Sequence, residues 1–238
     1  MNITTYIQHD FIDPADLAGK QTVVIDTFRA TTTMTTALKN GAKRMVTVMH
    51  VQDAFALQKQ DSTRLLGGER KTQKIAGFDF GNSPLEYTCQ AVQGREVVMS
   101  TTNGTKAATA AAQSDRILLG CFGNVAAVAE YLTQQNLDIV LLCAGTVGKL
   151  SMEDFLTAGA IVDALPKECA LCDTSIAARD LYRLHKNDLN GVLCHTKHYN
   201  TMLQNGLKDD IDFCMQVNTC DTVPIFDGIG FVNSKRGE

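Results

Sequence analysis

Acidic residues that follow or precede predicted strands and helices are the first candidates for chemistry in this chain. Asp26 ends an apolar, β-branched run, where a buried carboxylate is costly unless it is paired or binds a metal ion. Glu69 lies at the end of a predicted strand at 64–66, and Glu153 and Asp154 stand in the first turn of a predicted helix. Hard cations prefer clustered carboxylates. Each of these acids is therefore a candidate metal ligand or catalytic group.

Each acid also has an ordinary structural explanation. Asp26 can form an ion pair with Arg29 or cap the helix that follows. Glu69 can be a solvated side chain in a glycine turn, and Glu153 and Asp154 can simply interact with the helix dipole. The sequence leaves both explanations open at every one of these positions.

Small polar residues and an arginine supply candidate anion receptors. Arg29 lies at a turn whose following amides open a helix, and helix N-termini accept anions. A second loop joins a predicted strand to a predicted helix and offers hydroxyls and amides: Thr101, Thr102, Asn103, Gly104 and Thr105. Its alternative explanation is a capped loop without a ligand. Asn82 and Ser83 precede Pro84 and can also form a plain turn.

The elements that position these residues repeat one unit: an apolar strand, a short polar loop and a helix. This alternation predicts an α/β fold, a three-layer α/β/α arrangement with a mostly parallel sheet, whose strand-to-helix loops share one edge. Ligands bind at that edge in open α/β sheets. Residues 71–84 are predicted to form a long ordered loop, the C-terminal third after Asp173 to be helical, and 223–226 to be a last edge strand. We expect one domain over residues 1–238.

The composition of the chain argues against several classes of function. The 238 residues include 22 Lys and Arg against 26 Asp and Glu, a net charge of −4, which argues against a general nucleic-acid binder. No apolar run reaches the roughly 20 residues of a membrane-spanning helix, and no signal peptide is recognised. The eight cysteines are scattered, which favours free thiols in a reducing compartment. We expect a soluble, cytoplasmic protein with no nucleic-acid or membrane partner.

The remaining motifs are weak. Cys169 and Cys172 form a single CxxC pair, for which structural thiols are the simpler explanation. His195 and His198 can share a helical face, and a surface or core role is the safer interpretation. Residues 145–149 lack the earlier glycine of a phosphate-binding P-loop, and no dinucleotide-binding glycine motif follows a strand.

Taken together, the polar loops resemble the 2-phosphosulfolactate phosphatase family, the ComB-like proteins of coenzyme M biosynthesis. The resemblance covers nearly the whole chain, and its matching stretches are 24–33, 68–70, 77–84, 101–105, 143–145 with 153–154, Asp173, 210–211 and 223–224. The family implies a Mg2+-dependent hydrolase that removes phosphate from (R)-2-phospho-3-sulfolactate and releases 3-sulfolactate.

The residues fit that chemistry. A substrate with phosphate, sulfonate and carboxylate groups needs several anion receptors, which Arg29, Arg70 and the loop at 101–105 can supply, with Asn82 and Ser83 as further contacts. Phosphate removal also calls for a hard cation, and the candidate Mg2+ ligands are Asp26, Glu69, Glu153 and Asp154. Asp26 can instead attack phosphorus directly. The alternative hypothesis is a non-catalytic protein that binds small anions on the same scaffold. Homo-oligomer formation is left open.

Overall fold

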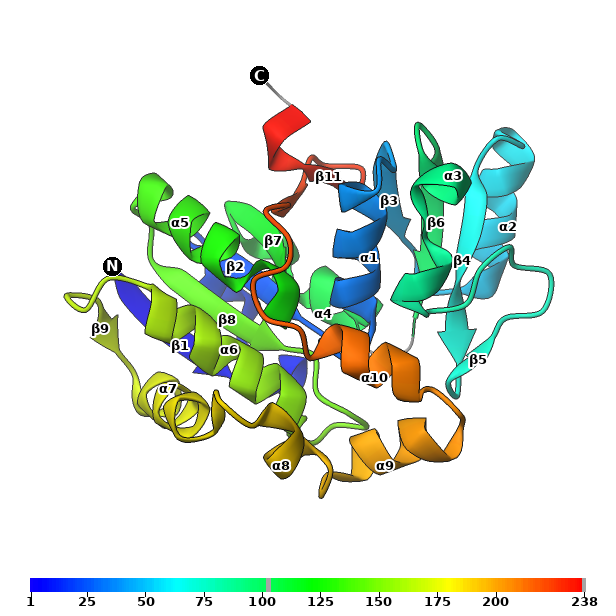
Figure 1. The fold of residues 1–238 in the computed structure, drawn as a ribbon. Helices are drawn as coiled ribbons and strands as arrows, with labels where there is room; N and C mark the ends of the chain where they lie inside the picture. Colours follow the sequence, from blue (N-terminus) through cyan, green and yellow to red (C-terminus); the bar gives the residue numbers. More distant parts are fainter. Residues whose placement is uncertain (102–103, 237–238) are drawn as a thin grey trace.

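An 11-stranded sheet forms the centre of the computed structural model, which describes residues 1–101 and 104–236 (Figure 1). The strands are β1 (Asn2–Tyr6), β2 (Gln21–Ile25), β3 (Arg44–Thr47), β4 (Leu65–Arg70), β5 (Gln73–Lys74), β6 (Glu96–Ser100), β7 (Arg116–Gly120), β8 (Ile139–Cys143), β9 (Ala170–Leu171), β10 (Pro224–Phe226) and β11 (Phe231–Asn233). Their order in the sheet is β5-β4-β6-β3-β11-β10-β7-β2-β8-β1-β9.

The sheet consists of two parallel groups joined by an antiparallel hairpin, and β5 is antiparallel to β4 at one edge. Strands β4, β6 and β3 are parallel to one another, as are β7, β2, β8, β1 and β9. The hairpin β10–β11 lies between the groups, where Ile225 pairs with Leu118 of β7 and Phe231 with Met45 of β3. The prediction of an edge strand at 223–226 is therefore wrong. The hairpin fills the gap between the two groups, so the backbone of β10 is paired on both sides.

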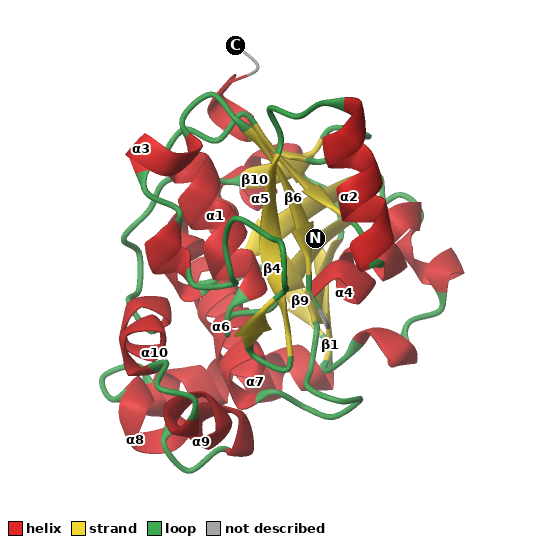
Figure 2. Ribbon diagram, turned by 90° about the vertical axis from the view of Figure 1, so that its right-hand side faces the viewer, coloured by secondary structure: helices red, strands yellow, loops and turns green. Residues whose placement is uncertain are grey.

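Helices cover both faces of this sheet. They are α1 (Ala30–Lys39), α2 (Val51–Gln60), α3 (Cys89–Val92), α4 (Gly104–Ala110), α5 (Val125–Gln135), α6 (Met152–Ala164), α7 (Asp173–His185), α8 (Leu189–Leu193), α9 (Lys197–Gln204) and α10 (Lys208–Cys214). Figure 2 shows α1 and α6 on one side of the strands and α2 and α4 on the other. The α/β class, the mostly parallel sheet and the helical C-terminal third are thus confirmed.

Buried strand residues explain why the sheet needs helices on both faces. All five residues of β2 are buried, and successive side chains of a strand point to opposite faces. Val23 and Ile25 accordingly belong to one apolar cluster, whereas Val24 belongs to a second. Burial on both faces is typical of a central parallel strand. It places the carboxyl end of β2, where Asp26 follows, in the interior of the protein.

The predicted elements agree with the structure except at a few boundaries. Strand β4 continues to Arg70, so that Glu69 lies within the strand rather than after it. The predicted loop at 71–84 holds only the two-residue strand β5 before a short 3-10 helix begins at Pro84. In the part of the chain that the structure describes, the helices are too short or too polar to span a bilayer.

Candidate active site

Asp26 lies immediately after the buried strand β2 and is 8% exposed. The amide of Ala30 donates to Asp26 Oδ1 over 3.4 Å, at the first residue of α1. The main chain of Asp26 is fixed by Thr31, whose amide donates to the Asp26 carbonyl at 3.0 Å and whose Oγ1 accepts from the Asp26 amide at 3.1 Å. The carboxylate is thus held at the N-terminus of a helix, which favours negative charge.

Three further carboxylates lie near enough to Asp26 to interact with it electrostatically. Burial raises the pKa of the Asp26 carboxyl to about 6. The negative charges of Glu69 and Glu153 add to this rise. Burial also raises the pKa of Asp154 well above its ordinary value, and the charges of Glu153 and Asp26 raise it further. The structure therefore brings the four predicted acids together, and we call Asp26, Glu69, Glu153 and Asp154 the acidic cluster.

Glu153 is paired with a histidine from the C-terminal third. His198 Nδ1 lies 2.5 Å from Glu153 Oε1, while Glu153 Oε2 is buried and has no hydrogen-bond partner among the described residues. Burial lowers the pKa of His198, but the hydrogen bond to Glu153 and the charges of Glu153 and Asp26 outweigh it, so that the pKa lies above its usual value. His198 therefore faces the acidic cluster from α9, and its surroundings favour the protonated imidazole.

Asp154 ties together two loops at the carboxyl ends of neighbouring strands. The amide of Thr27, after β2, donates to Asp154 Oδ1 at 2.8 Å, and the amide of Gly145, after β8, donates to Oδ2 at 3.1 Å. Both carboxylate oxygens therefore already accept backbone hydrogen bonds. This arrangement fits Asp154 as the residue that positions the loop of Asp26.

Arg29 pairs with Asp210 of α10. Arg29 Nη1 donates to Asp210 Oδ2 at 2.6 Å, and both residues are 4% exposed. Ser83 Oγ donates to the other oxygen of Asp210, also at 2.6 Å. The ion pair between Asp26 and Arg29 that the sequence left open is therefore replaced by a pair between Arg29 and Asp210.

Arg70 is bound to the protein's own backbone. Its Nη1 donates to the carbonyls of Glu69 and Ser100, and its Nη2 donates to the carbonyl of Met49 and to Ser100 Oγ, all within 2.8–3.2 Å. Four of the five N–H groups of a guanidinium are thereby used. The geometry favours a structural role for Arg70 over contact with a substrate, and it leaves Arg29 as the stronger candidate anion receptor.

The remaining predicted residues lie around these groups or outside the described chain. Glu69 Oε2 accepts from the Thr72 amide at 2.9 Å. Asn82 is buried, and its Oδ1 has no hydrogen-bond partner in the described parts of the chain. Thr101 is buried at the end of β6. Thr102 and Asn103 lie outside the described residues, and Gly104 and Thr105 begin α4, where the side chain of Thr105 is likewise not described.

The donor set suits a hard divalent cation. The carboxylates of the acidic cluster repel one another in a buried environment, and a cation would relieve that repulsion. Glu153 Oε2 and Asn82 Oδ1 are buried oxygens without hydrogen-bond partners in the parts of the chain that the structure describes, and oxygen is the donor that Mg2+ prefers. Within residues 1–101 and 104–236, no three acidic, histidine or cysteine side chains already stand in a metal-binding group. The acids have the right chemistry for the ion, but their side chains would have to move closer together to bind it.

Two residues of this site were missed by the sequence analysis: His198 and Asp210. His198 was interpreted as a surface or core histidine on a helical face shared with His195. That shared face is wrong, because α9 begins at Lys197 and the exposed His195 lies in the turn before it. Asp210 was noted only as part of the family resemblance. Asp209 precedes it in the first turn of α10, and only Asp210 is buried. No local pattern distinguishes these residues, because their role comes from the packing of α9 and α10 beneath the strand ends (Figure 1).

Comparisons with known proteins show which family the chain is similar to. The family model described as 2-phosphosulpholactate phosphatase matches residues 7–228. A protein of Caldanaerobacter subterraneus subsp. tengcongensis is 43% identical over 228 residues, which cover 94% of this chain and 95% of the relative. A protein of Clostridium perfringens is 42% identical over 229 residues, with 94% and 92% covered. Both are named "Probable 2-phosphosulfolactate phosphatase".

Proposed function

The chain belongs to the 2-phosphosulfolactate phosphatase family, and on this premise we propose that it hydrolyses (R)-2-phospho-3-sulfolactate to 3-sulfolactate and phosphate. The observation that carries the proposal is the buried acidic cluster beside Arg29 at the carboxyl ends of the strands. A protein that only bound anions would gain nothing from four carboxylates at the same place, because they repel the ligand. A phosphatase that works with a cation needs both kinds of group.

Mg2+ is the cofactor that we propose, with Asp26, Glu69 and Glu153 as the residues that would hold it and Asn82 as a further oxygen donor. When bound, such an ion neutralises charge on the phosphate and lowers the pKa of a bound water. Asp154 belongs to the same cluster but is engaged by two backbone amides. We therefore assign to Asp154 the positioning of the loop that carries Asp26.

Arg29 is the proposed receptor for the substrate's phosphate. Asp210 fixes one side of the guanidinium, and the Thr72 carbonyl accepts a longer hydrogen bond of 3.4 Å from Nη2. The guanidinium is thereby oriented in advance, with further N–H groups left for a substrate oxygen. Preorganised donors of this kind stabilise developing charge without a cost of rearrangement during the reaction.

Asp26 has two possible roles, either as a ligand of the cation or as the nucleophile that attacks phosphorus. Its position directly behind β2 and its fixed backbone support both. His198 Nδ1 lies 2.5 Å from Glu153 Oε1, a contact that keeps the imidazole oriented beside the cluster. Both roles make Asp26 indispensable.

Phosphate release from synthetic (R)-2-phospho-3-sulfolactate tests the proposal. We expect turnover with Mg2+, loss of turnover with EDTA, and a fall of roughly a thousandfold or more in Asp26→Asn. Asp53→Asn, which changes an exposed aspartate in α2, is the matched control and should keep full activity.

Two results would contradict the proposal. Turnover of the Asp26→Asn variant at the wild-type rate would remove Asp26 from the mechanism. A rise in melting temperature with the ester but no phosphate release under any metal condition would instead support the anion-binding alternative.

A further inference from the structure

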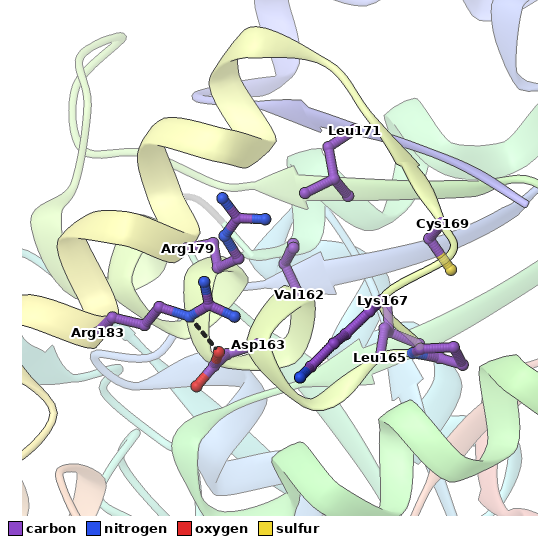
Figure 3. Close-up of a pocket in the computed structure, with 9 residues that line it drawn as sticks. Val162, Asp163, Leu165, Lys167, Cys169, Leu171, Arg179 and Arg183 are labelled. Atoms are coloured by element: carbon purple, nitrogen blue, oxygen red, sulfur yellow. Dashed lines mark hydrogen bonds and ion pairs between the residues drawn. The ribbon is translucent and has the colours of Figure 1, made fainter.

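A cavity of about 320 Å3 lies apart from the candidate active site, between the end of α6, the edge strand β9 and α7 (Figure 3). Its lining residues are Val162, Asp163, Leu165, Pro166, Lys167, Cys169, Leu171, Arg179 and Arg183. None of them belongs to the acidic cluster or to the partners of Arg29. The volume falls within the range of pockets that bind small molecules.

The charged groups of this cavity are mostly positive. Lys167, Arg179 and Arg183 line it together with a single acid, Asp163, although the whole chain has a net charge of −4. Among the described residues, Lys167 forms no ion pair. Arg179 Nε is bonded to Asp180 at 2.8 Å, outside the lining. The cavity is therefore a local cationic site on an acidic protein.

One of these cations is held in place. Arg183 Nε donates to Asp163 Oδ1 at 2.5 Å, the contact drawn in Figure 3, and Lys186 lies 3.7 Å from Asp163 Oδ2. Asp163 is thus already shared between two cations, so that it does not neutralise Lys167 or Arg179. Lys167 is left without an ion pair in the described chain, and Arg179, which pairs with Asp180 through Nε, is the second cation that can face an incoming anion.

The rest of the lining is mostly apolar. Val162 and Leu165 are each 5% exposed, and both belong to the core cluster that packs against α6. Pro166 and Leu171 extend this surface toward β9. Apolar walls with a few converging charges favour a ligand with a charged end and a short hydrocarbon part.

We propose that this cavity is a second binding site, which takes a small aliphatic carboxylate by its charged end at Lys167 and Arg179 and by its hydrocarbon chain against Leu165 and Leu171. The site is independent of the proposed phosphatase reaction, because the two share no residue. An anion bound there would bridge α6, β9 and α7.

Isothermal titration of the full-length protein with hexanoate tests this site. We expect saturable binding of one hexanoate per chain, binding of acetate weaker by about tenfold or more because it lacks the hydrocarbon chain, and no binding of hexylamine. The double variant Lys167→Gln/Arg179→Gln should bind hexanoate at least about tenfold more weakly, and Arg179→Lys should stay within a few fold of the wild type.

Matched controls separate a specific loss from a general one. Lys59→Gln and Arg116→Gln change exposed cations elsewhere and should bind hexanoate like the wild type. The melting temperature of each variant shows that it is folded, and phosphate release should be unchanged in the double variant, since its residues lie outside the candidate active site.

Three outcomes would overturn the inference. They are no hexanoate binding to the wild-type protein, equal binding of hexanoate by the folded double variant, and equal binding of hexylamine. If the protein did not hydrolyse the phosphate ester, hexanoate binding at this cavity would still be expected. The two proposals can therefore be refuted separately.

Discussion

The candidate active site has two sides whose buried charges are balanced differently. On the paired side, Arg29 and Asp210 form an ion pair whose second carboxylate oxygen is bonded by Ser83. On the side of the acidic cluster, Asp26 and its neighbouring carboxylates share His198 as the cation that pairs with Glu153. The paired side is complete as it stands. The acidic cluster is not, and this excess of negative charge is the reason why we propose a cation and the reaction there.

The largest expected effect is the loss of stability on the paired side in Asp210→Ala. Removing this carboxylate leaves the buried charge of Arg29 without its partner, which should lower the free energy of unfolding by about 3–5 kcal/mol. Urea unfolding measures the loss. The control is Asp212→Ala on the same helix, where the ion pair with Lys208 is exposed and should contribute little to stability. Equal losses in the two variants would mean that the Arg29 pair does not hold the site together.

On the acidic side, Glu153→Gln separates activity from stability. The glutamine keeps a hydrogen-bonding group near His198 but removes one charge from the cluster, so that kcat should fall by about a hundredfold or more, while the melting temperature without metal stays the same or rises. Steady-state kinetics and thermal unfolding check the two parts. Glu130→Gln, an exposed position on α5, is the control. A Glu153→Gln variant that is strongly destabilised but fully active would contradict the difference between the two sides.

The dependence of stability on pH tests the charge excess directly. The pKa of Asp26 is raised from 3.8 to about 6 in the folded protein, so the folded state binds more protons than the unfolded chain and loses stability as pH rises through this range. The raised pKa of His198 acts in the same direction, because its contribution is lost as pH rises past its folded value. In EDTA, the melting temperature should therefore fall less between about pH 4 and pH 7 in Asp26→Asn than in the wild type. Identical profiles would contradict the assignment.

The smallest expected effect concerns Arg70. Arg70→Lys keeps the positive charge but loses hydrogen bonds to the backbone around β4 and β6, which should lower the free energy of unfolding by about 1–2 kcal/mol. Its KM for the phosphate ester should stay close to that of the wild type, because the guanidinium is engaged by the protein itself. A large rise in KM without a change in stability would return Arg70 to the substrate contacts that the sequence predicted.

The sequence predicts local features well and misses those that depend on chain segments far apart in number. The apolar run before Asp26 predicts a buried strand, and parallel strands must bring their following loops to one edge. This is why the acidic cluster could be anticipated. The prediction that 223–226 is an edge strand was wrong because the sequence of a three-residue strand does not indicate which strands pair with it on either side.

The same reasoning explains the residues that were missed. His198 and Asp210 become important only because α9 and α10 fold back against Glu153 and Arg29, which precede them by 45 and 181 residues. In α9 and α10, each of these two residues is one of several polar residues, and its spacing does not distinguish it from the others. The predictions of one domain and of Asp26 as ligand or nucleophile stay predictions.

The central claim is that the acidic cluster holds a divalent cation, and thermal unfolding across a Mg2+ titration tests it most directly. The claim predicts a saturable rise in the melting temperature of the wild type, because an ion that binds only the folded state stabilises it. The rise should disappear in Asp26→Asn and remain in Asp53→Asn. A melting temperature that does not respond to Mg2+, or that responds equally in Asp26→Asn, would contradict the claim.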